Sequence, residues 1–210
     1  MNADLSIRAA VLTGAGSAFC SGGNVAEMRD RTGMFGGSPA QIAANYRAGI
    51  QRIPRAFQTL QVPIIAAVNG AAIGAGNDLA CMCDIRIAAD DAVFAESFVK
   101  LGIIPGDGGT WILPRVIGMS RAAELFYTGD VIDAATAKDW GLVSRVVPAD
   151  ALMDEARALA GKIALLPPHS LRHTKNLLRQ GQQTSYDTAL ELAANTQAMM
   201  HTTADHAEGV

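Results

Sequence analysis

The chain has 210 residues, of which 50% are hydrophobic and 18% are charged, and its formal net charge at pH 7 is −3. This composition excludes a disordered or fibrous protein and allows an α/β core of reasonable size with an appended helical piece. No run of Lys and Arg is longer than two residues. The charge pattern therefore argues against a general nucleic-acid-binding surface.

The first half of the chain alternates between short apolar runs and glycine-rich or helical stretches. In chain order, the pattern predicts a strand over 7–12, a loop over 13–17, an amphipathic helix over 39–60, a strand over 64–68, a turn at Asn69-Gly70, and a helix from about Gly74 to Cys83. The strand over 64–68 is apolar without alternation, which is typical of a strand that is covered on both faces.

The second half changes from mixed elements to helices alone. The expected elements are a strand over 85–88, a Gly/Pro-rich loop over 102–109, a helix through Leu113 and Ile117, a short helix from Asp133 to Gly141, a strand over 142–147, two helices within 150–180 divided by Pro167-Pro168, and a helix over 186–201. This order indicates an α/β core followed by a helical C-terminal subdomain.

The cysteines and histidines favour neither disulfides nor a metal centre. Cys20, Cys81 and Cys83 form an odd set without repeated spacing, so we expect free thiols and a cytoplasmic protein. His169 and His173 are spaced i, i+4 but lack a third ligand, and we expect no metal.

Neither a secretory signal nor a membrane span is expected. Residues 1–12 lack a basic region followed by a long apolar stretch. The most apolar region, 62–82, is interrupted by proline, asparagine, glycine and aspartate, which makes it a poor transmembrane segment.

Two segments, 10–25 and 63–80, carry the candidate chemistry. Each runs from a strand through a glycine-dense turn to the presumed start of a helix. Glycine allows a close approach of backbone to ligand, and a helix N-terminus leaves N–H groups unpaired with partial positive charge. Two such ends facing each other would place two donors on one developing oxyanion. The alternative is that these glycines serve only close packing and tight turns.

Together these segments resemble the signature of the enoyl-CoA hydratase/isomerase (crotonase) family. The resemblance runs from about Arg8 to the C-terminus. Further stretches match in the same order: 83–88, 101–110, 113–118, Thr128-Gly129 and 140–143. The resemblance implies a spiral core of repeated ββα units over 1–148 and a C-terminal helical subdomain over 149–210, which would mediate assembly into homotrimers or hexamers. The family's first strands have no counterpart before Ile7.

The resemblance also implies which residues bind an acyl-CoA. The oxyanion donors would be the backbone N–H groups of Gly23 and Ala75, and the adenosine end of CoA would lie along Ser21, Gly23 and Val25. Phe98 and Trp111 are candidates for the wall of the acyl pocket, or else core residues. CoA is expected only as part of the substrate, with no separate cofactor.

The family's hydratases use two carboxylic acids, and only one of them has a direct counterpart here. Asp78 stands at the first position, one methylene shorter than the usual Glu, and could otherwise be a polar residue in the first turn of its helix. Phe98 stands at the second position, where an acid is expected. Asp107 and Glu96 are the candidate replacements.

Both replacements have structural alternatives. Asp107 could be a turn or N-cap residue. Strand alternation would put Glu96 on the same face as Phe98, although a salt bridge at the surface or at a subunit contact is the other interpretation.

The sequence thus predicts an enoyl-CoA hydratase-like enzyme that stabilises a thioester enolate. The alternatives are an enoyl-CoA double-bond isomerase or another reaction of the family, and a catalytically silent acyl-CoA binder, motivated by Phe98. A serine hydrolase is disfavoured because no G-x-S-x-G motif occurs. Lys175 and Arg179 are candidates for phosphate contact, or solvated charges.

Overall fold

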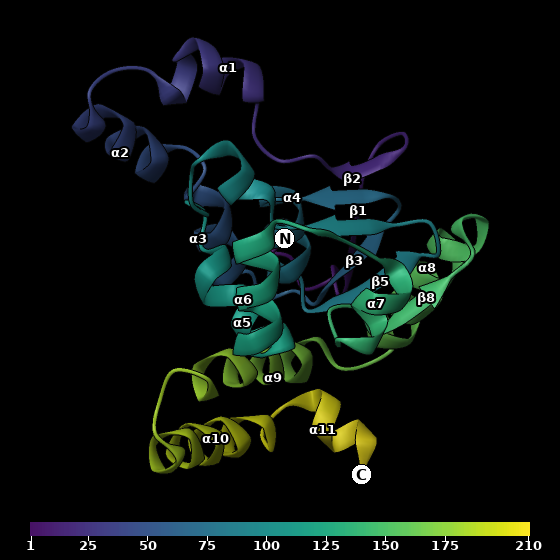
Figure 1. Ribbon diagram of the computed structural model, residues 1–210. Coiled ribbons are helices and arrows are strands. Elements are labelled where there is room, and N and C mark those ends of the chain that lie inside the picture. Colours follow the sequence, from purple (N-terminus) through teal and green to yellow (C-terminus); the bar gives the residue numbers. More distant parts are fainter. The chain divides into compact units, whose positions relative to one another are not determined.

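The computed structural model describes all of residues 1–210 (Figure 1). By their internal contacts the residues group into two compact units. The larger unit comprises Val11–Thr59 and Ile64–Arg157, and the smaller comprises Met1–Ala10, Leu60–Pro63 and Ala158–Val210. These units combine segments from distant parts of the chain, whereas the division expected at residue 148 follows chain order and stays a prediction.

The first sheet of the fold has four strands in the order β1-β3-β5-β8. β3 pairs with β5, and β5 with β8, in parallel. All five residues of β3 are buried, as the unbroken apolar run predicts. The strands are β1 (Ala10–Thr13), β3 (Ile64–Val68), β5 (Ile85–Ala89) and β8 (Arg145–Val147). β1 and β8 each begin three residues later than predicted.

A second four-stranded sheet, in the order β2-β4-β6-β7, was not predicted. β2, β4 and β6 are parallel, and β7 pairs antiparallel with β6. Each of its strands has only three residues, too few for alternation to be recognised. They are β2 (Ala18–Cys20), β4 (Ala71–Ile73), β6 (Val93–Ala95) and β7 (Val131–Asp133).

From β1 to β6, consecutive strands alternate between the two sheets, so this part of the chain repeats a strand–strand–helix unit. Asn69, in the turn after β3, ties the first two repeats together. Its Oδ1 accepts from the Gly14 N–H at 2.9 Å, and its Nδ2 donates to the Gly16 carbonyl at 2.9 Å. This side chain fixes the first glycine turn relative to the second.

The helical stretch predicted over 39–60 is two helices rather than one. α2 (Pro39–Ala48) ends at Gly49, and α3 (Arg52–Thr59) starts three residues later. Pro54 explains the break, because proline lacks the N–H that would bond to residue 50 and its ring clashes with that carbonyl. In the first turn of a new helix the missing N–H is not needed.

Wherever the sequence predicts another helix in the larger unit, the structure has one. α4 begins at Ala75, and Asp133 caps α7 through a bond to the Thr136 N–H. α1 begins at Val25, where segment 10–25 predicts the start of a helix, whereas α6 was not predicted. The bounds are α1 (Val25–Asp30), α4 (Ala75–Met82), α5 (Gly109–Ile117), α6 (Met119–Thr128) and α7 (Ala134–Asp139), with 3-10 turns η1 (Gly33–Phe35), η2 (Ser97–Leu101) and η3 (Ala149–Ala151), and α8 (Leu152–Ala164) following.

The smaller unit is mostly helical. The prolines at 167 and 168 separate α8 from α9 (Pro168–Gly181), as predicted, and α10 (Tyr186–Met200) packs against α9 (Figure 1). α11 (Ala204–Gly209) was not predicted, although Thr203 caps it with its side chain.

Two cations of α9 are structural within the smaller unit. The Arg172 guanidinium donates to the carbonyls of Asn2, Asp4 and Ile7, and the Lys175 ammonium donates to the Val62 carbonyl at 2.6 Å. Both side chains are buried, so the expectation of a solvated Lys175 is wrong. Because both cationic groups are buried and donate to neutral main-chain carbonyls, a structural role fits them better than contact with a phosphate.

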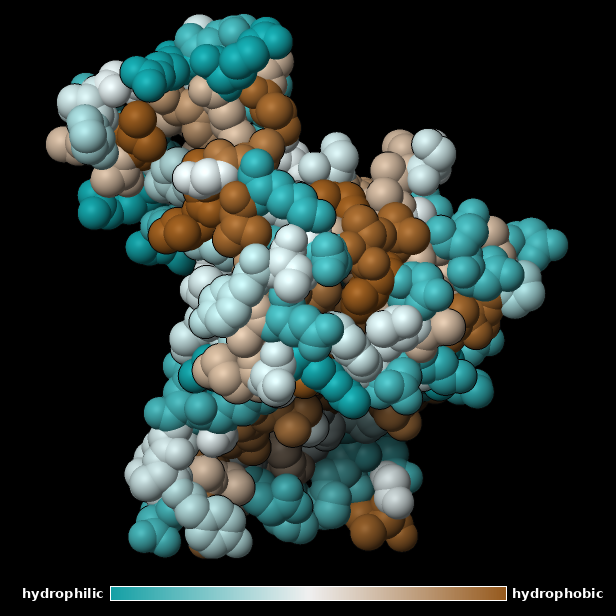
Figure 2. Space-filling view, viewed as in Figure 1, coloured by the Kyte–Doolittle hydropathy of each residue, from teal (hydrophilic) through white to brown (hydrophobic).

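The surface is mixed in character. Figure 2 shows hydrophobic side chains (brown) in several patches between hydrophilic ones (teal). None of the helices combines the length and the apolar character that crossing a bilayer requires.

Candidate active site

The two glycine turns meet within the larger unit. A Cβ on Gly76 would collide with the Cys20 carbonyl, so only glycine lets the first turn of α4 pack on the end of β2. A Cβ on Gly22, whose φ is +87°, would lie 2.8 Å from the Ile73 carbonyl oxygen and 3.5 Å from the Ala75 nitrogen. The loop before α1 and the N-terminus of α4 are therefore neighbours.

The backbone N–H groups of Gly23 and Ala75 are both unused. No hydrogen bond within the protein engages either of them. Ala75 is the first residue of α4, and Gly74 before it has φ +55° and provides no side-chain cap. The first N–H groups of a helix have no intrahelical partner. Two unpaired donors thus stand on adjacent segments, at the positive end of the α4 dipole.

Asp78 lies in the first turn of α4, three residues after Ala75. Its side chain is completely buried, and neither carboxyl oxygen accepts a hydrogen bond from a protein donor. Gly109, at the start of α5, packs directly on this carboxyl and leaves no room for a Cβ. A buried carboxyl without donors is costly unless it carries a proton or serves a function.

Glu96 also belongs to this buried group, but its position in the chain's secondary structure differs from the predicted one. It is not on a strand, because β6 ends at Ala95 and Glu96 precedes η2. The alternation argument was therefore wrong, and so was the surface salt bridge, because Glu96 is completely buried. Its Oε1 accepts a 2.7 Å hydrogen bond from the Nδ2 of Asn77, and its Oε2 has no partner.

Asp107 is the third carboxyl of the group. It is 4% exposed, and its Oδ1 has no partner. It does not cap α5, since Gly108 is the N-cap residue and offers no side-chain bond. Gly106 beside it packs on the ring of Tyr46, and the Gly106 carbonyl accepts from Gln51 at 2.9 Å. The α2–α3 segment therefore holds the loop that carries Asp107.

These three carboxyls interact electrostatically. Burial, followed by the charges of Glu96 and Asp107, raises the pKa of Asp78 well above its usual range. Burial also raises the pKa of Glu96, to about 8, although the hydrogen bond from Asn77 opposes this. No cation is among the groups that shift either pKa. The cluster therefore holds at least one proton near neutral pH, which suits proton transfer.

The other predicted contact residues differ in what the structure shows of them. A Cβ on Gly74 would lie 3.5 Å from the Phe98 ring, so Phe98 borders the N-terminus of α4. Ser21 and Val25 are exposed on the segment that carries Gly23. Trp111 is 38% exposed, and the Arg115 guanidinium stacks 3.9 Å from its ring centroid. Trp111 is thus not a core residue.

Sequence reasoning missed Asn77 and Tyr46. Asn77 is completely buried beside Asp78 and binds Glu96. The signal available was an amide inside an otherwise small and apolar helix. Tyr46 lies on α2, within the amphipathic stretch predicted over 39–60, and burial followed by the charge of Asp107 raises the pKa of its phenol.

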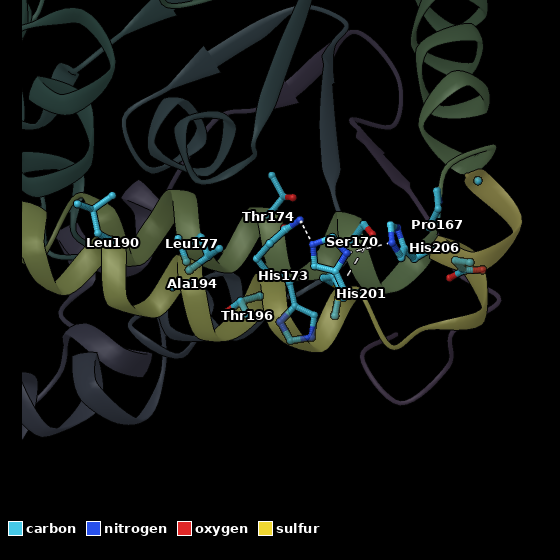
Figure 3. Close-up of a pocket in the computed structure, with 15 residues that line it drawn as sticks. Pro167, Ser170, His173, Thr174, Leu177, Leu190, Ala194, Thr196, His201 and His206 are labelled. Atoms are coloured by element: carbon cyan, nitrogen blue, oxygen red, sulfur yellow. Dashed lines mark hydrogen bonds between the residues drawn. The ribbon is translucent and has the colours of Figure 1, made fainter.

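A groove of about 710 Å³ lies elsewhere, among α9, α10 and α11 of the smaller unit (Figure 3). His173, His201 and His206 line it, and the Nδ1 of His201 lies 3.0 Å from the Nε2 of His206. None of the predicted catalytic or CoA-binding residues lines this groove.

Known proteins resemble this chain over its whole length. The family model described as enoyl-CoA hydratase/isomerase matches residues 1–210. A crotonyl-CoA hydratase of Syntrophomonas wolfei is 37% identical over 211 residues, covering 100% of this chain and 78% of that protein. A 1,2-epoxyphenylacetyl-CoA isomerase of Escherichia coli K12 is 38% identical over 207 residues, covering 99% of this chain and 78% of that protein.

The structural comparison agrees. A crystal structure of an enoyl-CoA hydratase from Mycobacterium smegmatis superposes with a TM-score of 0.90 at 35% identity, covering 99% of this chain and 78% of that one. The predicted α/β core with a helical C-terminal part is thus confirmed. The chain belongs to the enoyl-CoA hydratase/isomerase family.

Proposed function

We propose that this protein hydrates the double bond of a 2-enoyl-CoA thioester. The observation that carries the proposal is the buried carboxyl cluster of Asp78, Glu96 and Asp107, which begins one helical turn after the unpaired Ala75 N–H. Hydration needs a base for the water, an acid for the α-carbon and stabilisation of the enolate oxygen. In this proposal the carboxyl cluster provides the base and the acid, and the unpaired N–H groups near the start of α4 stabilise the enolate oxygen.

In the proposed reaction, a water oxygen bonds to the β-carbon while a carboxylate, Glu96 or Asp107, takes the water proton. The π electrons move to the thioester oxygen, where the N–H groups of Gly23 and Ala75 stabilise the negative charge. The protonated Asp78 then donates its proton to the α-carbon, giving a 3-hydroxyacyl-CoA. Proton exchange between the carboxyls restores the starting state.

Double-bond isomerisation is the second candidate reaction. The same cluster could remove a proton from one carbon of an enoyl thioester and return a proton to another. A relative from Bacillus subtilis that is 38% identical over 205 residues is named a putative enoyl-CoA hydratase/isomerase, which favours this alternative. A silent binder is less well supported, because a protein that only binds CoA has no need of three buried carboxyls, two of which, Asp78 and Glu96, have raised pKa values.

The remaining proposals concern binding and assembly. Ser21, Gly23 and Val25 would contact the CoA moiety through main-chain groups, Phe98 and Trp111 would border the acyl chain, and no cofactor beyond the substrate's CoA is proposed. Exposed Leu178, Tyr186 and Leu190 on α9 and α10 support a homotrimer or hexamer formed through the C-terminal helices. A reducing cytoplasm suits three cysteines that form no disulfide.

A thioester panel analysed by mass spectrometry tests the reaction. With crotonyl-CoA, we expect the conjugated enoyl absorbance to fall and the product to gain the mass of one water. With a 3-enoyl-CoA, an isomerase would instead raise that absorbance at unchanged mass. Binding of acyl-CoA without any change of mass or absorbance across the panel would contradict an enzymatic function.

Gly109→Ala should impair turnover more than binding. The added Cβ would displace the Asp78 carboxyl, and a displacement of about 1 Å at a reacting group costs about 100-fold in rate. We therefore expect kcat on crotonyl-CoA to fall by one to two orders of magnitude, roughly, with the Kd for CoA unchanged. Gly161→Ala, in an open position of α8, is the matched control and should keep full activity. Equal rates for both variants would show that the Asp78 position is unimportant.

A further inference from the structure

Asn77 and Glu96 form a buried pair that the proposed reaction has not yet used. Both side chains are completely buried, and the Nδ2 of Asn77 lies 2.7 Å from the Oε1 of Glu96. The Oδ1 of Asn77 has no hydrogen-bond partner. Burying the Asn77 Oδ1 without a hydrogen-bond donor destabilises the fold. The presence of an amide at this position therefore requires an explanation, and the bond from its Nδ2 to Glu96 is the candidate.

The bond makes the two carboxyls of the site different. Glu96 receives an N–H donor, whereas both oxygens of Asp78 lack any protein donor. A hydrogen-bond donor stabilises the ionised form of a carboxyl, and burial without one favours the neutral form. When Glu96 and Asp78 share a single proton, Glu96 is therefore the better place for the charge and Asp78 for the proton.

The surrounding groups do not reverse this difference. Burial and the charge of Asp107 raise the pKa of Glu96, whereas hydrogen bonds from Asn77 and, to a smaller extent, from Asp78 on α4 lower it. The Cys81 thiol on α4 responds to Asp78 and Glu96, and burial keeps it protonated by raising its pKa. Tyr46 on α2 responds to Asp107, and burial raises its pKa as well. The amide of Asn77 is thus the group that distinguishes the two carboxyls.

We propose that Asn77 is a positioning residue whose side-chain amide holds Glu96 as the ionised base and thereby leaves Asp78 as the protonated acid. This inference rests on the proposed function. It assigns the role of base to Glu96, which the proposed reaction left open between Glu96 and Asp107. In this assignment Glu96, through its unpartnered Oε2, accepts the proton from water, and Asp78 donates to the α-carbon. Asp107 then contributes a nearby charge and does not take the proton.

The test compares pH profiles of kcat/KM for crotonyl-CoA. The rate should rise with pH as Glu96 ionises. Asn77→Leu, which keeps the volume but removes the donor, should shift this rise to higher pH by about one unit, because an ionised Glu96 is then less stabilised. Asn77→Ser, which restores a donor, should recover part of the shift, and Glu96→Gln should abolish the rise. Asn195→Leu, on the exposed face of α10, is the control and should leave the profile unchanged.

Infrared titration of the substrate-free protein keeps this inference separate from the proposed function. The Glu96 carboxylate band is identified as the band that Glu96→Gln removes, and Asn77→Leu should move its midpoint to higher pH. If no thioester is turned over but this band shifts, the proposed reaction fails and the pairing stands. An unmoved midpoint in Asn77→Leu, or a pH rise that persists in Glu96→Gln, would overturn the assignment.

Discussion

Asp78→Asn is expected to lower turnover of crotonyl-CoA by about 100- to 10,000-fold, which is the contribution of a positioned acid or base. Asparagine has almost the shape of aspartic acid but cannot donate a carboxylic proton to the α-carbon. The binding of CoA should be unchanged, because the Asp78 side chain is buried and is not among the groups proposed to contact CoA.

The same variant should be more stable than the wild type at neutral pH. Burial raises the folded-state pKa of Asp78, so between the unfolded pKa near 4 and the higher folded pKa the folded state binds the extra proton. Stability of the wild type therefore falls as pH rises through this window, and Asp78→Asn removes that dependence. Thermal unfolding at several pH values measures it, with the exposed Asp91→Asn as control.

A loss of activity together with a gain of stability distinguishes a catalytic carboxyl from a structural one. Replacing an aspartate that stabilises the fold would instead lower the thermal stability of the protein. Asp78→Asn with full activity, or with reduced thermal stability at pH 7, would refute the role given to this residue.

Ala75→Pro is expected to lower kcat/KM by about 100- to 1,000-fold, the cost of removing one oxyanion donor (roughly 2.7–4 kcal/mol). Proline has no N–H, and the first position of a helix is the one place where it is tolerated, because that N–H makes no intrahelical bond. The substitution thus removes a donor that the fold does not use.

Ala75→Ser is the matched control, since it changes the side chain but keeps the amide. It should retain activity within roughly tenfold, whereas Ala75→Pro should not. Circular dichroism and thermal unfolding of both variants would show whether α4 is intact. Equal activities of the two, with both folded, would mean that the Ala75 N–H has no part in the reaction.

Much of the first sheet could be predicted because its central strands, β3 and β5, are largely apolar runs of five residues. The run over 64–68 was recognisable as a covered strand, and the cap at Asp133 and the prolines at 167 and 168 marked helix ends correctly. The second sheet was missed because its three-residue strands show no periodicity. The single helix over 39–60 was wrong because apolar spacing was weighed above Gly49 and Pro54.

In the candidate site, features that lie within one motif could likewise be predicted, whereas contacts between distant residues could not. Asp78 and the two turns were recognisable from the sequence, since each lies within a single motif. The pairing of Asn77 with Glu96 joins residues 19 positions apart at the ends of two elements, and no pattern along the chain reports it. Burial of Glu96 likewise depends on how β6 ends, which spacing alone did not show.

The most direct test is a crystal structure of the protein with a bound, unreactive acyl-CoA analogue. We predict that one carbonyl oxygen of the analogue lies about 2.7–3.1 Å from both main-chain nitrogens, of Gly23 and of Ala75. A carbonyl oxygen that contacts neither nitrogen, or only one of them while the other points away, would contradict the account.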